Sequence, residues 1–568
     1  MTAVDRVNAL TSEERGQVDS QEASPSTPDS KKEGAAAIPG FTDQSRVLPR
    51  KELAAVFAGL CIVLFMASLD QTIVSVLTPT LGKTFNAPQY IAWVGTSYLL
   101  TSTSMQPLYG KLSDIFGRKN MILFAIFFFL VGSLVCGAAP SIIVLAIGRG
   151  IAGIGAGGLI GLTMIIVSDV VSPRERGKYQ GIIGAMFGLS AIIGPLLGGF
   201  LAEHSTWRWA FYLNLPLGAV STVAMFFILK LPTVKGSYRQ KLGRVDFLGS
   251  ITFVIGIICV LLSTNWGGNE YSWSSTQIIV PYCVGAVFIA IFLFIEAKIA
   301  VEPILPFRLF RNRSVCSTYA TSFFIGGAFL GVIFYCPLYF QLVKHYSATR
   351  SGLQLLPLVG GMMFGGIGSG VLITKTGRYR PFIWTALAIY VVGVALLSLW
   401  ELDSKMNVQI GYLFVVGLGL GGCMQSVVLA GQSSVGFEDV ATVTATLAFF
   451  RSMGGVVGVA IGGSLINNTL TKQGVDANNY RDVSMHPDKY AMATQAVFRM
   501  CVAWPALALI SSLFIEHYEL RKNVGGRGAD TKVSEKIEEV SGIQSDDVGQ
   551  KIEVLVDEER ENHEEREQ

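Results

Sequence analysis

Long apolar runs separated by short polar segments cover most of the chain, from about residue 53 to residue 517. A run of about 20 apolar residues is long enough to cross a bilayer as a helix. A backbone in lipid must satisfy its own hydrogen bonds, so each run predicts a membrane-spanning helix and the fold is expected to be all-α. The fourteen expected spans are 53–77, 91–112, 121–139, 141–167, 179–201, 208–230, 247–264, 277–297, 315–340, 351–373, 381–400, 408–432, 440–466 and 496–517.

Composition agrees with this pattern. The chain has 568 residues, of which 51% are hydrophobic and 15% charged, whereas a soluble protein carries nearer a quarter charged residues. The net charge of +3 gives no sign of a nucleic-acid partner. Residues 1–50 and 519–568 are polar or charged, so we expect two disordered cytosolic tails.

Basic residues alternate between loops in a way that sets the orientation. Lys and Arg gather in the loops after spans 2, 4, 6, 8 and 10, which the positive-inside rule places in the cytosol together with both tails. Residues 1–50 contain no signal peptide, so the first span is expected to act as an uncleaved anchor. The sequon at Asn467 falls on the outer side, at the start of the loop after span 13, and predicts glycosylation there. We expect a plasma-membrane protein, with the vacuolar membrane as the alternative.

Glycine spacing reveals an internal repeat at an offset of eight spans. GKLSDIFGRKN at 110–120 matches GVLITKTGRYR at 370–380, GIGAGG at 153–158 matches GLGLGG at 417–422, and GPLLGG at 194–199 matches GVAIGG at 458–463. Two six-helix halves, 51–230 and 301–518, are therefore expected, with an inserted two-helix hairpin and its linkers at 231–300. Repeated halves around a central cavity are typical of transporters.

Three charges stand away from the ends of the spans: Asp70, Arg149 and Arg451. A charge at such depth is expensive and marks a functional site by default. Asp70 and Arg149 lie at comparable depth from the same membrane face, so they can pair. A structural role is the alternative for each, and for Arg451 it is as well supported as a functional one.

Two glycine-containing motifs provide further candidate residues. Gly110, Asp114, Gly117 and Arg118 suit a tight helix-loop-helix turn in which Asp114 pairs with Arg118 or caps the next helix; the alternative is a plain topology signal. In span 5, a set of small residues favours close packing and a kink, unless they are merely tolerated by lipid. That set is Gly188, Gly194, Pro195, Gly198 and Gly199.

Other chemistry has little support in the sequence. The two GxGxxG matches lie inside apolar spans, where close helix packing explains them better than a dinucleotide. There is no Walker A motif and no HExxH motif, and the five histidines lie in loops, span ends or tails. We therefore expect no enzyme activity, no cofactor and no metal site.

The segment at 110–120 resembles the cytosolic loop signature of the major facilitator superfamily. Arg149 with Gly153 and Gly157 resembles the proton-transfer motif of its fourth span, with Ala152 in place of the usual Gln. GPLLGG with Gly188 is similar to the antiporter motif of its exporters. LDQTIVSVLTP (69–79), WRWAFYLNLPLG (207–218) and FFRSMGGVVG (449–458) resemble the fourteen-span drug:proton antiporter branch, although Ser75 and Leu77 depart from its pattern.

This resemblance implies a proton-coupled efflux transporter for small organic toxins, drugs or secondary metabolites, similar to the pumps of fungi. Asp70, Arg149 and Arg451 would serve proton or substrate coupling, and the motif at Gly110 would form a cytosolic gate. The expected partners are a small-molecule substrate, protons and the lipid bilayer, and a monomer is expected. The alternatives are a siderophore or vacuolar basic amino-acid transporter, or a transporter-like membrane sensor.

Overall fold

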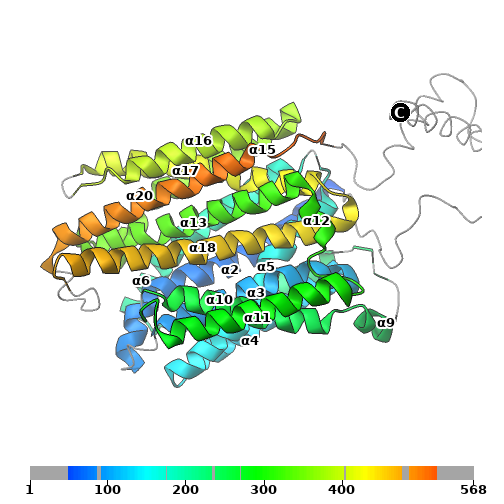
Figure 1. Ribbon diagram of the computed structural model, residues 1–568, viewed down its shortest axis with the longest axis horizontal. Helices are drawn as coiled ribbons and strands as arrows, with labels where there is room; N and C mark the ends of the chain where they lie inside the picture. Colours follow the sequence, from blue (N-terminus) through cyan, green and yellow to red (C-terminus); the bar gives the residue numbers. More distant parts are fainter. Residues whose placement is uncertain are drawn as a thin grey trace, which may run out of the picture. The chain divides into compact units, whose positions relative to one another are not determined.

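The computed structural model describes residues 49–85, 91–173, 175–229, 231–232, 234, 237–268, 270–401, 404–475 and 485–520, and both predicted tails lie almost wholly outside this part. The described residues form helices (Figure 1). The long ones are α2 (Arg50–Phe85), α3 (Ile91–Phe116), α4 (Arg118–Ala138), α5 (Ile142–Val170), α6 (Arg176–His204), α8 (Asn214–Ile228), α10 (Phe247–Trp266), α11 (Thr276–Lys298), α13 (Arg313–Leu342), α15 (Leu356–Thr376), α16 (Arg380–Leu397), α17 (Met406–Ser433), α18 (Val440–Lys472) and α20 (Pro487–Ser512). Short helices are α7 (Trp209–Tyr212), α9 (Tyr238–Gly243), α12 (Phe307–Arg311), α14 (Ala348–Leu353) and the 3₁₀ turn η2 (Phe437–Asp439).

Each of the fourteen predicted spans corresponds to a helix. Thirteen helices in the described part are long and apolar enough to cross a membrane. The remaining one, α3, has the length but is too polar by composition, because it carries a run of Thr, Ser and Gln residues. Thr103, Ser104 and Gln106 are all buried, so the polarity of α3 faces other helices rather than lipid.

Several helix boundaries differ from the prediction. α2 continues to Phe85, α18 continues to Lys472 and α20 begins at Pro487, because a helix does not have to end where its apolar run ends. Two expected spans are interrupted, one between α7 and α8 and one between α14 and α15. Both breaks lie just before a proline near the start of the next helix, Pro216 and Pro357, and proline is best tolerated in the first turn.

The internal repeat is present in the packing. In α5, Gly153 abuts the backbone of α3 and Gly155 that of α4. In α17, Gly417 abuts α15 and Gly419 abuts α16, which are the helices that the eight-span offset pairs with α3 and α4. The two GxGxxG segments are therefore helix-packing surfaces.

The loop glycines of the repeat share an uncommon backbone conformation. Gly117 precedes α4 with φ of 95°, and its repeat partner Gly377 follows α15 with φ of 71°. Side chains other than glycine rarely adopt positive φ. The spacing of the two loop motifs thus reflects a turn geometry as well as a charge signal.

The two halves touch along two seams, which we define as the contacts α3/α18 and α6/α15. A Cβ added at Gly110 of α3 would lie 2.7 Å from the Cβ of Ala445 in α18. A Cβ added at Gly370 of α15 would lie 2.3 Å from the carbonyl oxygen of Gly177 in α6. Gly110 and Gly370 are repeat partners, so one pseudo-symmetric contact closes both seams at the end of the bundle that carries the basic loops.

The inserted hairpin, α10 and α11, packs on the α3/α18 seam (Figure 1). Phe253 and Ile257 of α10 share an apolar cluster with Leu100 and Leu108 of α3 and with Phe449 of α18. α11 packs on α10 and turns a largely apolar, exposed surface outward. The hairpin is therefore held through α10, on both halves at once.

Candidate functional site

Asp70 and Arg149 form a buried ion pair. Nη1 of Arg149, in α5, donates to Oδ2 of Asp70, in the middle of α2. The two side chains are 1% and 2% exposed. The pairing expected from their matched depth is present, and neither charge is left alone in the apolar interior.

Other helices of the N-terminal half complete this network. Nδ2 of Asn214, at the start of α8, donates to Oδ1 of Asp70 at 3.0 Å and approaches Oγ of Ser133 at 3.1 Å. Nε of Arg149 donates to the carbonyl of Val94 at 3.0 Å. The guanidinium carbon lies 4.1 Å from the ring centre of Tyr98, a cation–π contact. Both oxygens of Asp70 and much of the Arg149 guanidinium are therefore occupied.

The Asp70 carboxylate accepts one hydrogen bond from each of two side chains, the guanidinium of Arg149 and the amide of Asn214. The carboxylate is enclosed by α2, α3, α5 and α8, all from one half. Direct contact between Asp70 and a substrate would require a different conformation from the one described.

The predicted loop motif is an ion-pair cluster. Nη1 of Arg118 lies 2.7 Å from Oδ1 of Asp114, and its Nε lies 2.8 Å from Oδ2 of Asp169 in α5. Arg118 also donates to Oγ of Ser113 at 2.6 Å. The cap before α4 is Gly117 and has no side-chain hydrogen bond, so Asp114 acts through the ion pair and the capping alternative is wrong. The cluster ties the ends of α3, α4 and α5 together.

The glycines of the predicted antiporter motif face two different helices. A Cβ at Gly194 would collide with Oγ1 of Thr72 in α2, and one at Gly188 would lie 2.7 Å from Cγ1 of Val359 in α15. Gly198 and Gly199 are buried. Pro195 lies in α6, but its side chain is outside the described part, and so is the predicted kink. The small residues let α6 approach its own half and the opposite half together.

Arg451 stands apart from these groups. It lies in the middle of α18 and is partly buried. Among the described residues, no carboxylate forms an ion pair with its guanidinium, whereas Asp70 and Arg149 neutralise each other. The structure therefore separates the three charges that the sequence grouped together.

A row of amides crosses from one half to the other between α6, α17 and α18. Nε2 of Gln180 in α6 lies 3.3 Å from Oε1 of Gln432 in α17, and Nε2 of Gln432 donates to Oγ1 of Thr444 in α18 at 3.0 Å. Gln425, also in α17, is 3% exposed, and neither of its amide atoms has a hydrogen-bond partner in the described part. The sequence analysis did not single out any of these residues, although uncharged amides inside apolar spans were a usable signal.

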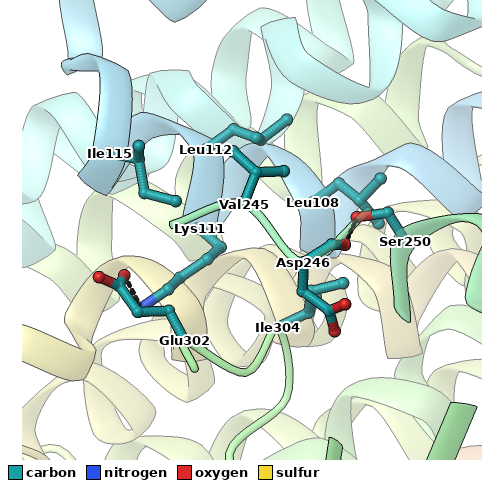
Figure 2. Close-up of a pocket in the computed structure, with 9 residues that line it drawn as sticks. All are labelled: Leu108, Lys111, Leu112, Ile115, Val245, Asp246, Ser250, Glu302 and Ile304. Atoms are coloured by element: carbon teal, nitrogen blue, oxygen red, sulfur yellow. Dashed lines mark hydrogen bonds and ion pairs between the residues drawn. The ribbon is translucent and has the colours of Figure 1, made fainter. Parts of the chain in front are cut away.

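A second ion cluster ties the inserted hairpin to α3. Glu302, in the linker after α11, lies 2.9 Å from Nζ of Lys111 and 2.5 Å from Nε of Arg244. Lys111, Glu302 and Asp246 line a shallow pocket with apolar walls (Figure 2). Burial alone raises the pKa of Glu302, but the hydrogen bonds and charges of Arg244 and Lys111 outweigh it, so this pKa lies below its usual range. We call Lys111, Arg244 and Glu302 the linker clamp.

The structure corrects the expected position of Asn467. The residue lies inside α18, not in a loop, and its Nδ2 donates to the carbonyl of Gly268 at 3.1 Å. Helix α18 runs one to two turns beyond the end of its apolar run, so the predicted loop begins later. Glycosylation stays a prediction, and it would require the loss of this hydrogen bond.

Comparisons with known proteins agree with this architecture. Residues 60–459 match the family model of the Major Facilitator Superfamily. The chain is 35% identical over 430 residues to the MFS-type efflux pump MFS1 of Arthroderma benhamiae, which covers 75% of this chain and 80% of that protein. It is 32% identical over 537 residues to Citrate exporter 1 of Yarrowia lipolytica, which covers 91% of this chain and 80% of that protein.

A solved structure gives the same picture at the level of fold. A crystal structure of the human organic anion transporter MFSD10 (TETRAN) superposes with a TM-score of 0.56 and 16% sequence identity. The match covers 83% of this chain and 100% of that one. With thirteen described helices long and apolar enough to cross a membrane and with this set of relatives, the chain belongs to the Major Facilitator Superfamily.

Proposed function

We propose that this protein is a proton-coupled exporter that moves small organic molecules out of the cell by alternating access. The observation that carries the proposal is the buried pair of Asp70 and Arg149, a titratable carboxylate enclosed in one of two halves that touch along glycine-lined seams. The matched relatives named as an efflux pump and an exporter support the direction of transport. Their printed names differ in cargo, so similarity alone does not assign one.

The coupling step would exchange the partners of Asp70. In the described conformation the carboxylate is held by Arg149 and Asn214, and both seams are closed at the end with the basic loops. Under the positive-inside rule that end is cytosolic, both termini are cytosolic and the site is closed toward the cytosol. Protonation of Asp70 would weaken its hold on Arg149 and favour reopening of the seams. The protein would act as a monomer in the plasma membrane.

Transport by the Asp70→Asn variant tests this proposal. The gene is deleted, and metabolites retained by the cells are identified by mass spectrometry. Inverted vesicles with an acidic lumen should accumulate the retained compound when they contain the wild-type protein. We expect Asp70→Asn to abolish this accumulation because asparagine cannot ionise; the protein should remain folded, with a lower melting temperature because Arg149 loses its counter-charge.

An exposed carboxylate provides the matched control. Asp488→Asn, in the first turn of α20, should transport at the wild-type rate. Undiminished accumulation by Asp70→Asn would refute the coupling role. Uptake by intact cells, or vesicles that release the compound instead of accumulating it, would favour import or vacuolar sequestration. Signalling that depends on the compound without any flux would favour a membrane sensor.

A further inference from the structure

From the amide row and the position of Arg451 we infer that Arg451 and Gln425 form a binding subsite for organic anions, in which a carboxylate is held by the guanidinium and an adjacent donor by the Gln425 amide. This inference rests on the proposed transport function and names the substrate class for it.

Gln425 lies between the two halves. Its side chain packs on Gly184 of α6, where an added Cβ would lie 3.4 Å from Nε2 of Gln425. One turn earlier along α6, Gln180 contacts Gln432 of α17. α6 belongs to the N-terminal half and α17 to the C-terminal half, so Gln425 occupies the same junction as the amide row, farther from the basic loops.

Arg451 shares the register of Gln425. α17 and α18 run antiparallel, and the bond between Gln432 and Thr444 fixes their alignment. Seven residues back from Gln432 is Gln425, and seven residues on from Thr444 is Arg451. Seven residues are almost two full turns, so each residue lies on the same face of its helix about 10 Å farther along.

The neighbours of Arg451 in the chain leave this same face for its side chain. Phe450 stacks on Tyr319 of α13, with ring centres 5.2 Å apart. Ser452 exchanges hydrogen bonds with Gln106 of α3 at 3.1 and 3.2 Å. Arg451 lies between these two residues around the α18 axis. Its side of the helix therefore faces the junction with α17 and α6.

Among the described residues, the side chains of Arg451 and Gln425 lack partners that a ligand can supply. A buried amide with neither donor nor acceptor satisfied is disfavoured, and so is a cation in an apolar span without a counter-charge. A carboxylate can accept two parallel hydrogen bonds from a guanidinium. The amide of Gln425 can donate to the same anion and accept from a neighbouring hydroxyl or N–H group. The site therefore suits a carboxylate with an adjacent donor, and it opposes organic cations.

Three fluorescent probes with one shared aromatic body test this inference. N-dansylglycine is anionic, N-dansylglycinamide is neutral and N-dansylethylenediamine is cationic at neutral pH. Binding to the purified full-length protein in nanodiscs is measured by dansyl fluorescence. We expect the wild-type protein to bind N-dansylglycine about tenfold or more tightly than the neutral probe, and the cationic probe more weakly still.

Variants of both residues assign the preference to this site. In Arg451→Gln, and in Gln425→Glu, where the new carboxylate would pair with Arg451, the preference for the anion should fall to about unity. Arg451→Lys should keep part of it, because lysine retains the charge but not the paired donors. Lys472→Gln, at the exposed end of α18, should bind like the wild type. Melting temperatures verify that each variant is folded.

Three outcomes of the binding experiment would contradict the proposed subsite. Equal binding of the three probes by the wild type, no measurable binding of N-dansylglycine, or an anion preference retained in both Arg451→Gln and Gln425→Glu would each overturn the inference. An anion preference without flux under a pH gradient would refute the transport proposal and leave the subsite standing. Flux of an organic cation that neither substitution changes would refute the subsite and leave the transport proposal standing.

Discussion

At the scale of single residues, the chain treats its buried charges in two ways. Arg149 and Arg118 are each paired with carboxylates inside the N-terminal half, at Asp70 for one and at Asp114 and Asp169 for the other. Arg451, in the C-terminal half, has no such partner in the described part. Ion pairs of this kind hold helices together, whereas a cation without a counter-charge can pair with a ligand.

The pair of Asp70 and Arg149 should show strong energetic coupling. Arg149→Leu leaves a buried carboxylate without its counter-charge, which costs about 3–5 kcal/mol, and we expect a large fall in melting temperature. Asp70→Asn in the same chain removes the stranded charge and should restore much of the loss. Thermal unfolding of the two single variants and the double variant in one detergent measures the coupling.

Additive losses in the double variant would contradict this pairing. Arg208→Leu serves as the control, since Arg208 also donates to a backbone carbonyl, that of Ala139, but forms no ion pair in the described part. Its effect should not depend on residue 70.

At the scale of elements, the inserted hairpin is fastened at both ends. The linker clamp joins its two flanks to α3, and beyond it Arg308 lies 2.8 Å from Asp439, just before α18. At the opposite end Thr96 of α3 donates to Asn265, and Ser464 of α18 donates to the carbonyl of Gly267. An element that touches both halves at both ends will respond when the halves move.

The linker clamp should be insensitive to mild acid. The pKa of Glu302 lies below its usual value of about 4.3, so its ionised form stabilises the clamp at all pH values above the unfolded pKa. This contribution is lost only as the pH falls through the lowered folded-state pKa. Glu302→Gln should therefore raise amide hydrogen exchange across residues 299–306 relative to the wild type at pH 7 and at about pH 5 alike. The two proteins should converge only once the pH has fallen below the lowered pKa of Glu302.

Lys298→Gln gives the comparison for this experiment, because Lys298 ends α11 nearby and is exposed. Its exchange should follow the wild type at every pH. A difference between Glu302→Gln and the wild type that already vanishes at about pH 5 would show that the pKa of Glu302 is not lowered.

At the scale of the whole molecule, two pseudo-symmetric seams close one end of the bundle. Each seam brings a helix of one half against a helix of the other through glycines that the repeat conserves in position, Gly110 on α3 and Gly370 on α15. Close packing through small residues is strong yet free of interlocking side chains, which suits surfaces that separate and meet again. Alternating access requires this separation.

A reversible cross-link across the α3/α18 seam should arrest transport. The Cβ atoms of a Gly110→Cys/Ala445→Cys pair would start 2.7 Å apart, so a shift of about 1 Å brings them into the 3.5–4.5 Å range of a disulfide. We expect oxidation of the double variant to stop flux and dithiothreitol to restore it. Flux of the retained metabolite in inverted vesicles is the measurement.

Each single cysteine variant is the control and should be unaffected by oxidation. Full transport by a quantitatively cross-linked protein would mean that this seam does not open during the cycle.

The sequence predicted the helices and the repeat far better than the side-chain contacts between helices. Apolar runs locate each of the fourteen helices, and glycine spacing identifies which helices correspond, because both depend on local periodicity. The partners of Arg118 and Asp70 include Asp169 and Asn214, which lie 51 and 144 residues away in the chain. Gln425 carries no charge and therefore did not stand out within its apolar run. Such long-range choices depend on packing that no local pattern records.

The position of the hairpin has a consequence for how lipid-dissolved molecules reach the interior. The two seams are equivalent by the repeat, but α10 and α11 cover only the α3/α18 seam from the bilayer side. A hydrophobic compound diffusing in the membrane leaflet therefore meets a second layer of helices there, whereas in the described part neither α10 nor α11 packs on the α6/α15 seam. Lateral entry from the lipid would therefore occur at the α6/α15 seam. The inserted hairpin makes the two seams, which the repeat renders equivalent, differ in their access to the bilayer.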